Sequence, residues 1–149
     1  MYKKLTIILM LIFFSISIIG CSNAKSEDIV EVYHFRGESK NWKATYSVVG
    51  YELTLENRDR TFFQSAKDTQ FELSYKGEQA DLASCTLEYD YKTSVGSNHY
   101  SFNFGDKPTQ KTFVNNNRIR GAGIEEKDEI IEVTVKLNDK VEVIELKSN

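Results

Sequence analysis

The sequence predicts an all-β fold, an immunoglobulin-like antiparallel β-sandwich of about 7–9 strands. First, apolar and polar residues alternate over several stretches, with the period of a half-buried strand. Second, clusters of Gly, Asn and Asp separate these stretches, as in turns between strands. Third, no stretch after residue 28 has a helical period. We therefore expect one face of each sheet in the core and the other in water.

The first predicted strands lie between residues 42 and 76. Residues 42–48 alternate regularly, but the phase shifts before residues 51–55. A shift of one residue turns a whole set of side chains to the other face, so we expect a β-bulge or a turn at Val49 and Gly50. Two further strands are predicted at residues 60–65 and 70–76, followed by a turn at residues 76–78.

The second half of the chain contributes strands at residues 83–92 and 99–104. Turn residues punctuate it at 96–98, 105–108 and 115–117. Residues 131–137 and 141–146 alternate around Asn138 and Asp139, which predicts a C-terminal β-hairpin.

Two residues are candidates for the core. Trp42 is the single tryptophan, and Tyr46 lies on the same face of the predicted strand, so Trp42 is the expected core anchor. Cys85 falls among the apolar odd positions of residues 83–92, where we expect a small buried hydrophobe rather than a reactive thiolate.

The N-terminal segment carries the most specific signal. Lys3 and Lys4 precede an apolar run from Leu5 to Ile19, which is followed by Gly20 and Cys21. This pattern, ending in Ile-Ile-Gly-Cys, resembles the signal peptide of a bacterial lipoprotein. The resemblance implies cleavage of residues 1–20, lipid attachment such as palmitate at Cys21, and a position on the outer face of the cell membrane.

Two other interpretations of this segment are weaker. A membrane-spanning helix needs roughly 20 apolar residues, and the run has about 15. An ordinary secretory signal ends in a small-x-small site, which Ile18 fits poorly. Two acyl chains hold a protein stably on a bilayer, so no spanning helix is needed.

The chain that remains after residue 20 has the length of one ordinary domain. We expect residues 21–28 to be the lipidated N-terminus and linker, and residues 29–149 to be the folded domain. Removal of Lys3 and Lys4 with the signal leaves 17 basic and 22 acidic side chains, so the net charge changes from −3 to −5. Since the basic residues are scattered, nucleic acid is an unsuitable partner.

A second resemblance rests on residues 35–43, which read F-R-G-E-S-K-N-W-K. An F-x-G-E-S-x-N-W segment after a short linker resembles a group of small uncharacterised lipoproteins of Gram-positive bacteria. Residues 73–78 and the C-terminal hairpin are similar to that group too, although Lys136 stands where a tryptophan is expected. The resemblance implies the membrane address and the β architecture, and it brings no biochemical role that could be carried over to this chain.

Three groups of polar residues are candidates for chemistry. Residues 37–41 form a polar cluster before Trp42, which favours a loop in which Gly37 sets a turn and local hydrogen bonds hold the chain. Residues 125–129, from Glu125 to Glu129, hold four carboxylates without the spacing of a calcium loop, so a solvated loop is expected, with weak cation binding left open. His34 and His99 have no second ligand at zinc spacing and are expected to be exposed or hydrogen-bonded.

These observations predict no catalytic, metal-binding or cofactor-binding residue, because no nucleophile, zinc or phosphate-loop motif is present. The first hypothesis is a non-catalytic module that binds a protein, peptide or wall partner, or serves the cell envelope. The second is a carrier of a small ligand in an apolar cavity. The third is a cell-envelope hydrolase with carboxylates that are distant in sequence.

Overall fold

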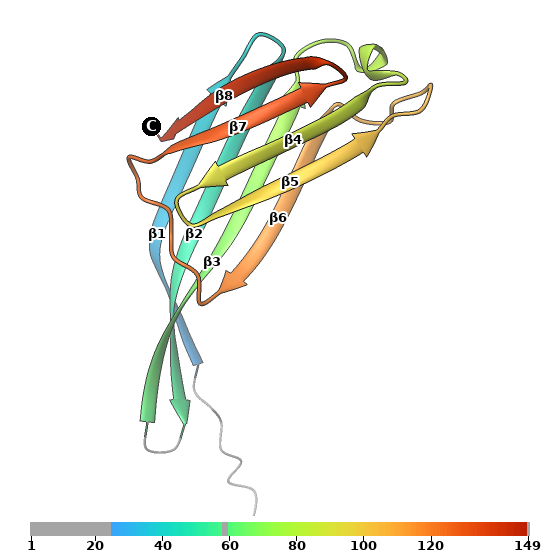
Figure 1. Cartoon of the computed structure of the whole chain (residues 1–149). Coiled ribbons are helices and arrows are strands. Elements are labelled where there is room, and N and C mark those ends of the chain that lie inside the picture. Colours follow the sequence, from blue (N-terminus) through green and yellow to red (C-terminus); the bar gives the residue numbers. More distant parts are fainter. Residues whose placement is uncertain (1–24, 58–59, 149) are drawn as a thin grey trace, which may run out of the picture.

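The part of the chain that the structure describes forms eight antiparallel strands, which belong to one curled sheet (Figure 1). The computed structural model describes residues 25–57 and 60–148. The strands are β1 (Lys25–Glu38), β2 (Trp42–Asn57), β3 (Arg60–Tyr75), β4 (Thr86–Thr93), β5 (Gly96–Asn103), β6 (Thr112–Arg120), β7 (Ile130–Leu137) and β8 (Lys140–Ser148), with a short 3-10 helix, η1 (Gln79–Leu82), before β4. Residues 1–20 and Cys21 lie outside the described residues.

The sheet has the strand order β5-β4-β7-β8-β1-β2-β3-β6. Its two halves meet where β1 pairs with β8. The curl brings the halves face to face, since Phe71 of β3 stacks on Tyr91 of β4 with 4.3 Å between ring centroids. The prediction of an all-β fold is confirmed. The immunoglobulin-like sandwich is not confirmed, because backbone hydrogen bonds join the strands of one half to those of the other in a single sheet.

Gly37 explains why the two halves stay joined. It lies in β1 where this strand passes β8, and a Cβ at this position would overlap the backbone carbonyl of Glu145. A larger residue would push β1 away from β8 and open the sheet at the junction. We expected this glycine to set a turn, and it instead allows two strands to approach closely.

The core fills the space between the two halves with large side chains. Trp42 is 1% exposed, which confirms it as a core anchor, and Tyr46 is buried on the same face. Tyr89 of β4 stacks on Phe71 and donates a hydrogen bond of 2.7 Å to the side chain of Asn115 in β6. Aromatic residues from both halves thus interlock across the interior, where the burial of apolar surface is the dominant favourable contribution to folding.

Strands β2 and β3 are 16 residues long, and each joins two of the predicted strands. Their pairing keeps one register throughout, so the expected irregularity at Val49 and Gly50 is absent from β2. The register shift lies in β1, between Ile29 and Glu31. β1 also includes residues 25–28, which we expected in the linker, because they pair with residues 52–55 of β2.

Beyond the bulge, three strands continue without the rest of the sheet. β6 pairs with β3 only as far as Ala66, and β8 pairs with β1 only near Phe35. Residues 25–30 of β1, 51–57 of β2 and 60–65 of β3 therefore project as a three-stranded extension, which we call the β-arm (Figure 1).

Two predicted turns and one predicted strand start are wrong. Asn115, Asn116 and Asn117 lie inside β6, where they pair with β3. Residues 96–98 begin β5, and the turn before them falls at Ser94 and Val95. β4 starts at Thr86 rather than at residue 83. Turn-forming residue types are compatible with a strand when a neighbouring strand supplies the hydrogen bonds.

Candidate functional site

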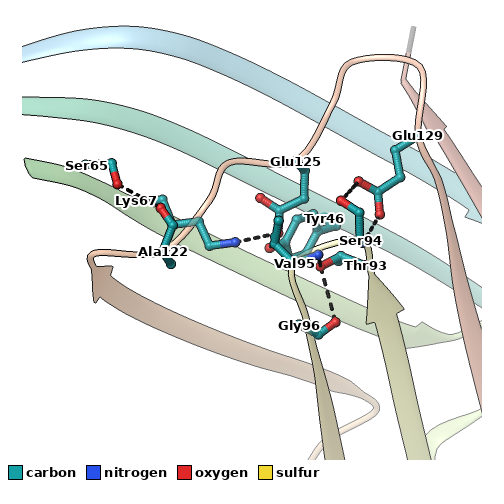
Figure 2. Close-up of polar contacts among 10 residues, drawn as sticks. All are labelled: Tyr46, Ser65, Lys67, Thr93, Ser94, Val95, Gly96, Ala122, Glu125 and Glu129. Carbon is teal, nitrogen blue, oxygen red and sulfur yellow. Dashed lines mark hydrogen bonds and ion pairs between the residues drawn. The ribbon is translucent and has the colours of Figure 1, made fainter.

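A buried polar triad, formed by Tyr46, Lys67 and Glu125, lies at the end of the core next to the β-arm (Figure 2). Glu125, on the loop between β6 and β7, is 1% exposed and accepts two hydrogen bonds on its Oε1 atom. One comes from the Tyr46 hydroxyl and one from the Lys67 ammonium, each at 2.7 Å. Lys67 is buried as well, so the ion pair is nearly closed to water.

The triad holds the loop in place rather than offering a reactive group. Burial, together with the hydrogen bond to Glu125, raises the pKa of the Tyr46 phenol far above its ordinary value, so the phenol stays protonated and donates. Glu125 Oε2 is buried without a hydrogen-bond partner among the described residues. Because neither Glu125 nor Lys67 faces solvent, a substrate has no access to them.

The acidic run at residues 125–129 is therefore divided between two environments. Glu126, Lys127 and Asp128 are exposed, as predicted, but Glu125 is in the core, so the prediction of a wholly solvated loop is wrong. Glu129 accepts hydrogen bonds from the backbone N–H and the hydroxyl of Ser94, the latter at 2.7 Å. Within the described residues, no group of three or more His, Cys, Asp or Glu side chains is placed to hold a metal ion.

A second polar arrangement lies on the outer face of the sheet, opposite the core. Four residues that pair directly across β1, β2, β3 and β6 form one row: His34, Ser47, Gln70 and Asn116. The next row holds Val32, Val49, Asp68 and Arg118. We call these two rows the outer groove, because most of their side chains line an open groove of about 590 Å³.

Three side chains of the first row, those of Ser47, Gln70 and Asn116, are uncharged and can both donate and accept hydrogen bonds. His34 Nδ1 and Ser47 Oγ lie 2.9 Å apart and share a hydrogen bond. Gln70 and Asn116 are exposed. The second row lies about 7 Å from the first, two residues further along each strand. The row thus offers a line of hydrogen-bonding groups across four strands.

The charges in the second row are paired with each other. Arg118 lies 3.5 Å from Asp68, and its guanidinium also stacks over the Tyr51 ring. The Tyr51 hydroxyl donates to Asp68 at 3.0 Å. The groove therefore has little net charge to recruit an ion, and its recognition chemistry is that of neutral hydrogen bonds.

The polar cluster at residues 37–41 is structural, as predicted, but through a distant partner. The Asn41 backbone and side chain both donate to the Glu142 carboxylate of β8, at 3.1 and 2.6 Å. Partial burial would raise the pKa of Glu142, but the hydrogen bonds from Asn41 help to hold it below its ordinary value. The cluster ties the β1–β2 connection to β8.

Cys85 differs from its prediction. It is a free cysteine that is half-buried rather than in the core, and it lies just before β4. Its Sγ accepts a hydrogen bond from Asn138 at 3.3 Å and contacts the Asp81 carbonyl at 3.6 Å. His99 is exposed on β5, as predicted.

Sequence reasoning missed the outer groove because it interpreted residues 115–117 as a turn. The missed signal is the alternation from Phe113 to Arg118, in which odd positions face the core and even positions face outward. The triad was not foreseen either, since Tyr46 and Glu125 are 79 positions apart in the chain.

No protein-family model, no curated protein and no solved structure matches this chain.

Proposed function

We propose that this protein is a lipid-anchored lipoprotein on the outer face of the cell membrane, where it binds a neutral polar partner without catalysis. The observation that carries the binding role is the row of His34, Ser47, Gln70 and Asn116 along the outer groove. The anchor is proposed from the Ile-Ile-Gly-Cys sequence that ends at Cys21. The described residues contain no helix that is long and apolar enough to cross a membrane.

The chemistry of the row defines the class of ligand. Hydroxyl, amide and imidazole groups complement a ligand rich in hydroxyls and amides, and they give little attraction to a strongly charged one. A glycan or peptide of the cell wall has this chemistry and occurs where the anchor would hold the protein. Each hydrogen bond contributes on the order of 1 kcal/mol, so one contact alone gives weak binding. A polymer whose repeats contact several side chains of the row at once gains affinity from many such contacts.

The binding role is tested with purified cell-wall material as the probe. The full-length protein in mild detergent is mixed with insoluble wall, sedimented, and measured in the pellet and supernatant. A variant with Gln70→Ala and Asn116→Ala should lose most of its binding. The matched control is Ser101→Ala, an exposed position of β5 outside the outer groove. Equal sedimentation of the double variant and the control would contradict the role of the groove.

The anchor is tested separately by metabolic labelling with palmitate. The wild-type chain should be labelled and sediment with membranes, whereas Cys21→Ala should be unlabelled and released. A Cys21→Ala chain that keeps its label and its membrane association would refute lipidation at Cys21.

Hydrolysis is a second candidate function, favoured by one observation. The 2.9 Å hydrogen bond between His34 and Ser47 lies in an accessible groove, as a base and nucleophile require. However, the nearby carboxylate of Asp68 is engaged by Tyr51 and Arg118. If Ser47→Ala abolished release of soluble fragments from wall material while binding persisted, hydrolysis would replace the binding role. A carrier of apolar ligands is less well supported, because stacked aromatic side chains occupy the interior.

A further inference from the structure

The β-arm carries exposed apolar side chains along its length. Phe62 and Phe63, near its tip, are 48% and 69% exposed, and Ile29 and Val30, near its base, are exposed by half or more. Large apolar side chains gathered at one end of a molecule mark a surface that another apolar phase covers. The core of the protein does not use these residues.

These side chains point to both faces of the β-arm. Phe62 pairs with Leu55 and Ile29 with Tyr51, so they share the face of the odd positions of β2. Phe63 pairs with Thr54 and lies on the opposite face, where it lines a shallow groove of about 250 Å³ with Val30. A rigid protein partner covers one face of a sheet, whereas a lipid phase can surround both.

The described part of the chain begins at the same end of the molecule as the tip of the β-arm. Lys25, the first described residue, pairs with Leu55, which in turn pairs with Phe62. Three adjacent strands span about 10 Å. Cys21 is four residues before Lys25, and four residues of extended chain reach at most about 14 Å. An acyl chain on Cys21 therefore keeps the β-arm tip at the bilayer surface.

We propose that the tip of the β-arm inserts into the outer leaflet of the membrane, with Phe62 and Phe63 at the boundary of headgroups and acyl chains. Apolar side chains of membrane-surface proteins enter this boundary by about 5–10 Å. The inference rests on the lipid anchor of the proposed function and adds a second contact to it. Two contacts restrict the rotation of the domain that a single flexible anchor allows.

This insertion also places the outer groove relative to the membrane. Gln70 follows Phe62 by eight residues along β3, which corresponds to about 26 Å of strand. The β-arm then acts as a spacer that holds the groove away from the lipid headgroups. A ligand in the cell wall is thereby accessible, and the bilayer surface itself is out of reach of the groove.

The experiment uses the full-length lipidated protein in vesicles of phosphatidylglycerol and phosphatidylcholine that contain brominated acyl chains. Bromine quenches tryptophan only at short range, and the buried Trp42 contributes a constant background. A Phe63→Trp variant should lose about half or more of its added fluorescence. The matched control is Val143→Trp, a 53% exposed position of β8 away from the β-arm, and it should be unaffected. Phe62→Trp is a second reporter should Phe63→Trp fail to fold.

The possible outcomes separate the two proposals. A palmitate-labelled chain whose Phe63→Trp and Phe62→Trp variants respond like Val143→Trp overturns the insertion and leaves the anchor. Protection of both reporters from bromine, combined with a doubled mass in detergent, would assign the tip to a second copy of the chain and overturn the insertion as well. A chain without lipid at Cys21 overturns the anchor, and this inference with it.

Discussion

Glu125→Gln is the substitution that tests the structure most directly, because it removes one charge from a buried ion pair with little change of shape. Glu125 Oε1 lies 2.7 Å from Lys67 Nζ, and the two side chains are 1% and 4% exposed. At this distance and an effective dielectric constant of 20, the Coulomb attraction is about 6 kcal/mol, much of which the desolvation of both groups offsets. Loss of one partner leaves Lys67 buried without a counter-charge, which typically costs about 3–5 kcal/mol.

The measurement is urea unfolding of the full-length protein in mild detergent, with linear extrapolation to water. Glu125→Gln should lower the free energy of unfolding by about 3–5 kcal/mol. The control Glu126→Gln, at an exposed neighbour in the same loop, should change it by less than about 0.5 kcal/mol.

A double variant checks the physical reason for the loss. Adding Lys67→Met to Glu125→Gln removes the orphaned charge and keeps an amide oxygen as acceptor for the Tyr46 hydroxyl. The double variant should therefore be more stable than Glu125→Gln alone, by about 1–4 kcal/mol. The reasoning would be refuted if Glu125→Gln matched Glu126→Gln, or if the double variant were less stable than the single one.

Three further predictions concern other parts of the fold. Gly37→Ala should lower the free energy of unfolding in urea by more than about 2 kcal/mol, because the added Cβ meets a backbone carbonyl of β8. Gly96→Ala should be tolerated, because its Cβ enters open space. Equal losses for the two variants would contradict the close approach of β1 and β8. Asn41 lowers the pKa of Glu142 in the folded state. The stability advantage of wild type over Asn41→Ala should therefore be full above the pKa of Glu142 in the unfolded state, and it should shrink as the pH falls through the folded-state pKa. A difference in the free energy of unfolding that does not vary with pH would exclude this linkage. Cys85→Ser should cost less than about 1 kcal/mol, because its hydroxyl can form both polar contacts of the thiol, and a loss above about 2 kcal/mol would indicate an apolar site.

The strands with one apolar face were the predictable part of this structure. Trp42 and Tyr46 alternate with polar neighbours, and both lie in the core because burial of aromatic area outweighs other local preferences. The C-terminal hairpin was predicted nearly residue by residue, since Asn138 adopts the positive φ of 53° that its turn requires.

Predictions failed where a partner from elsewhere in the chain decided the outcome. Asn115–Asn117 favour a turn locally, but hydrogen bonds from β3 hold them in β6. Gly37 was interpreted through its conformational freedom, and its actual role is the lack of a side chain opposite β8. The candidate site follows the same rule, because the outer groove exists only when four strands come into register.

The sequence by itself determined the all-β class, the core face of β2 and the C-terminal hairpin, because the period-2 alternation of side chains is a local property that a single strand carries. Only the tertiary structure decided that the two halves form one continuous sheet, that Glu125 is buried against Lys67, and that the β-arm exposes Phe62 and Phe63 at the end where the chain enters the fold. These features depend on pairings between segments far apart in sequence, whose free energy includes loop closure, desolvation and side-chain packing together. No local pattern of residues encodes that sum.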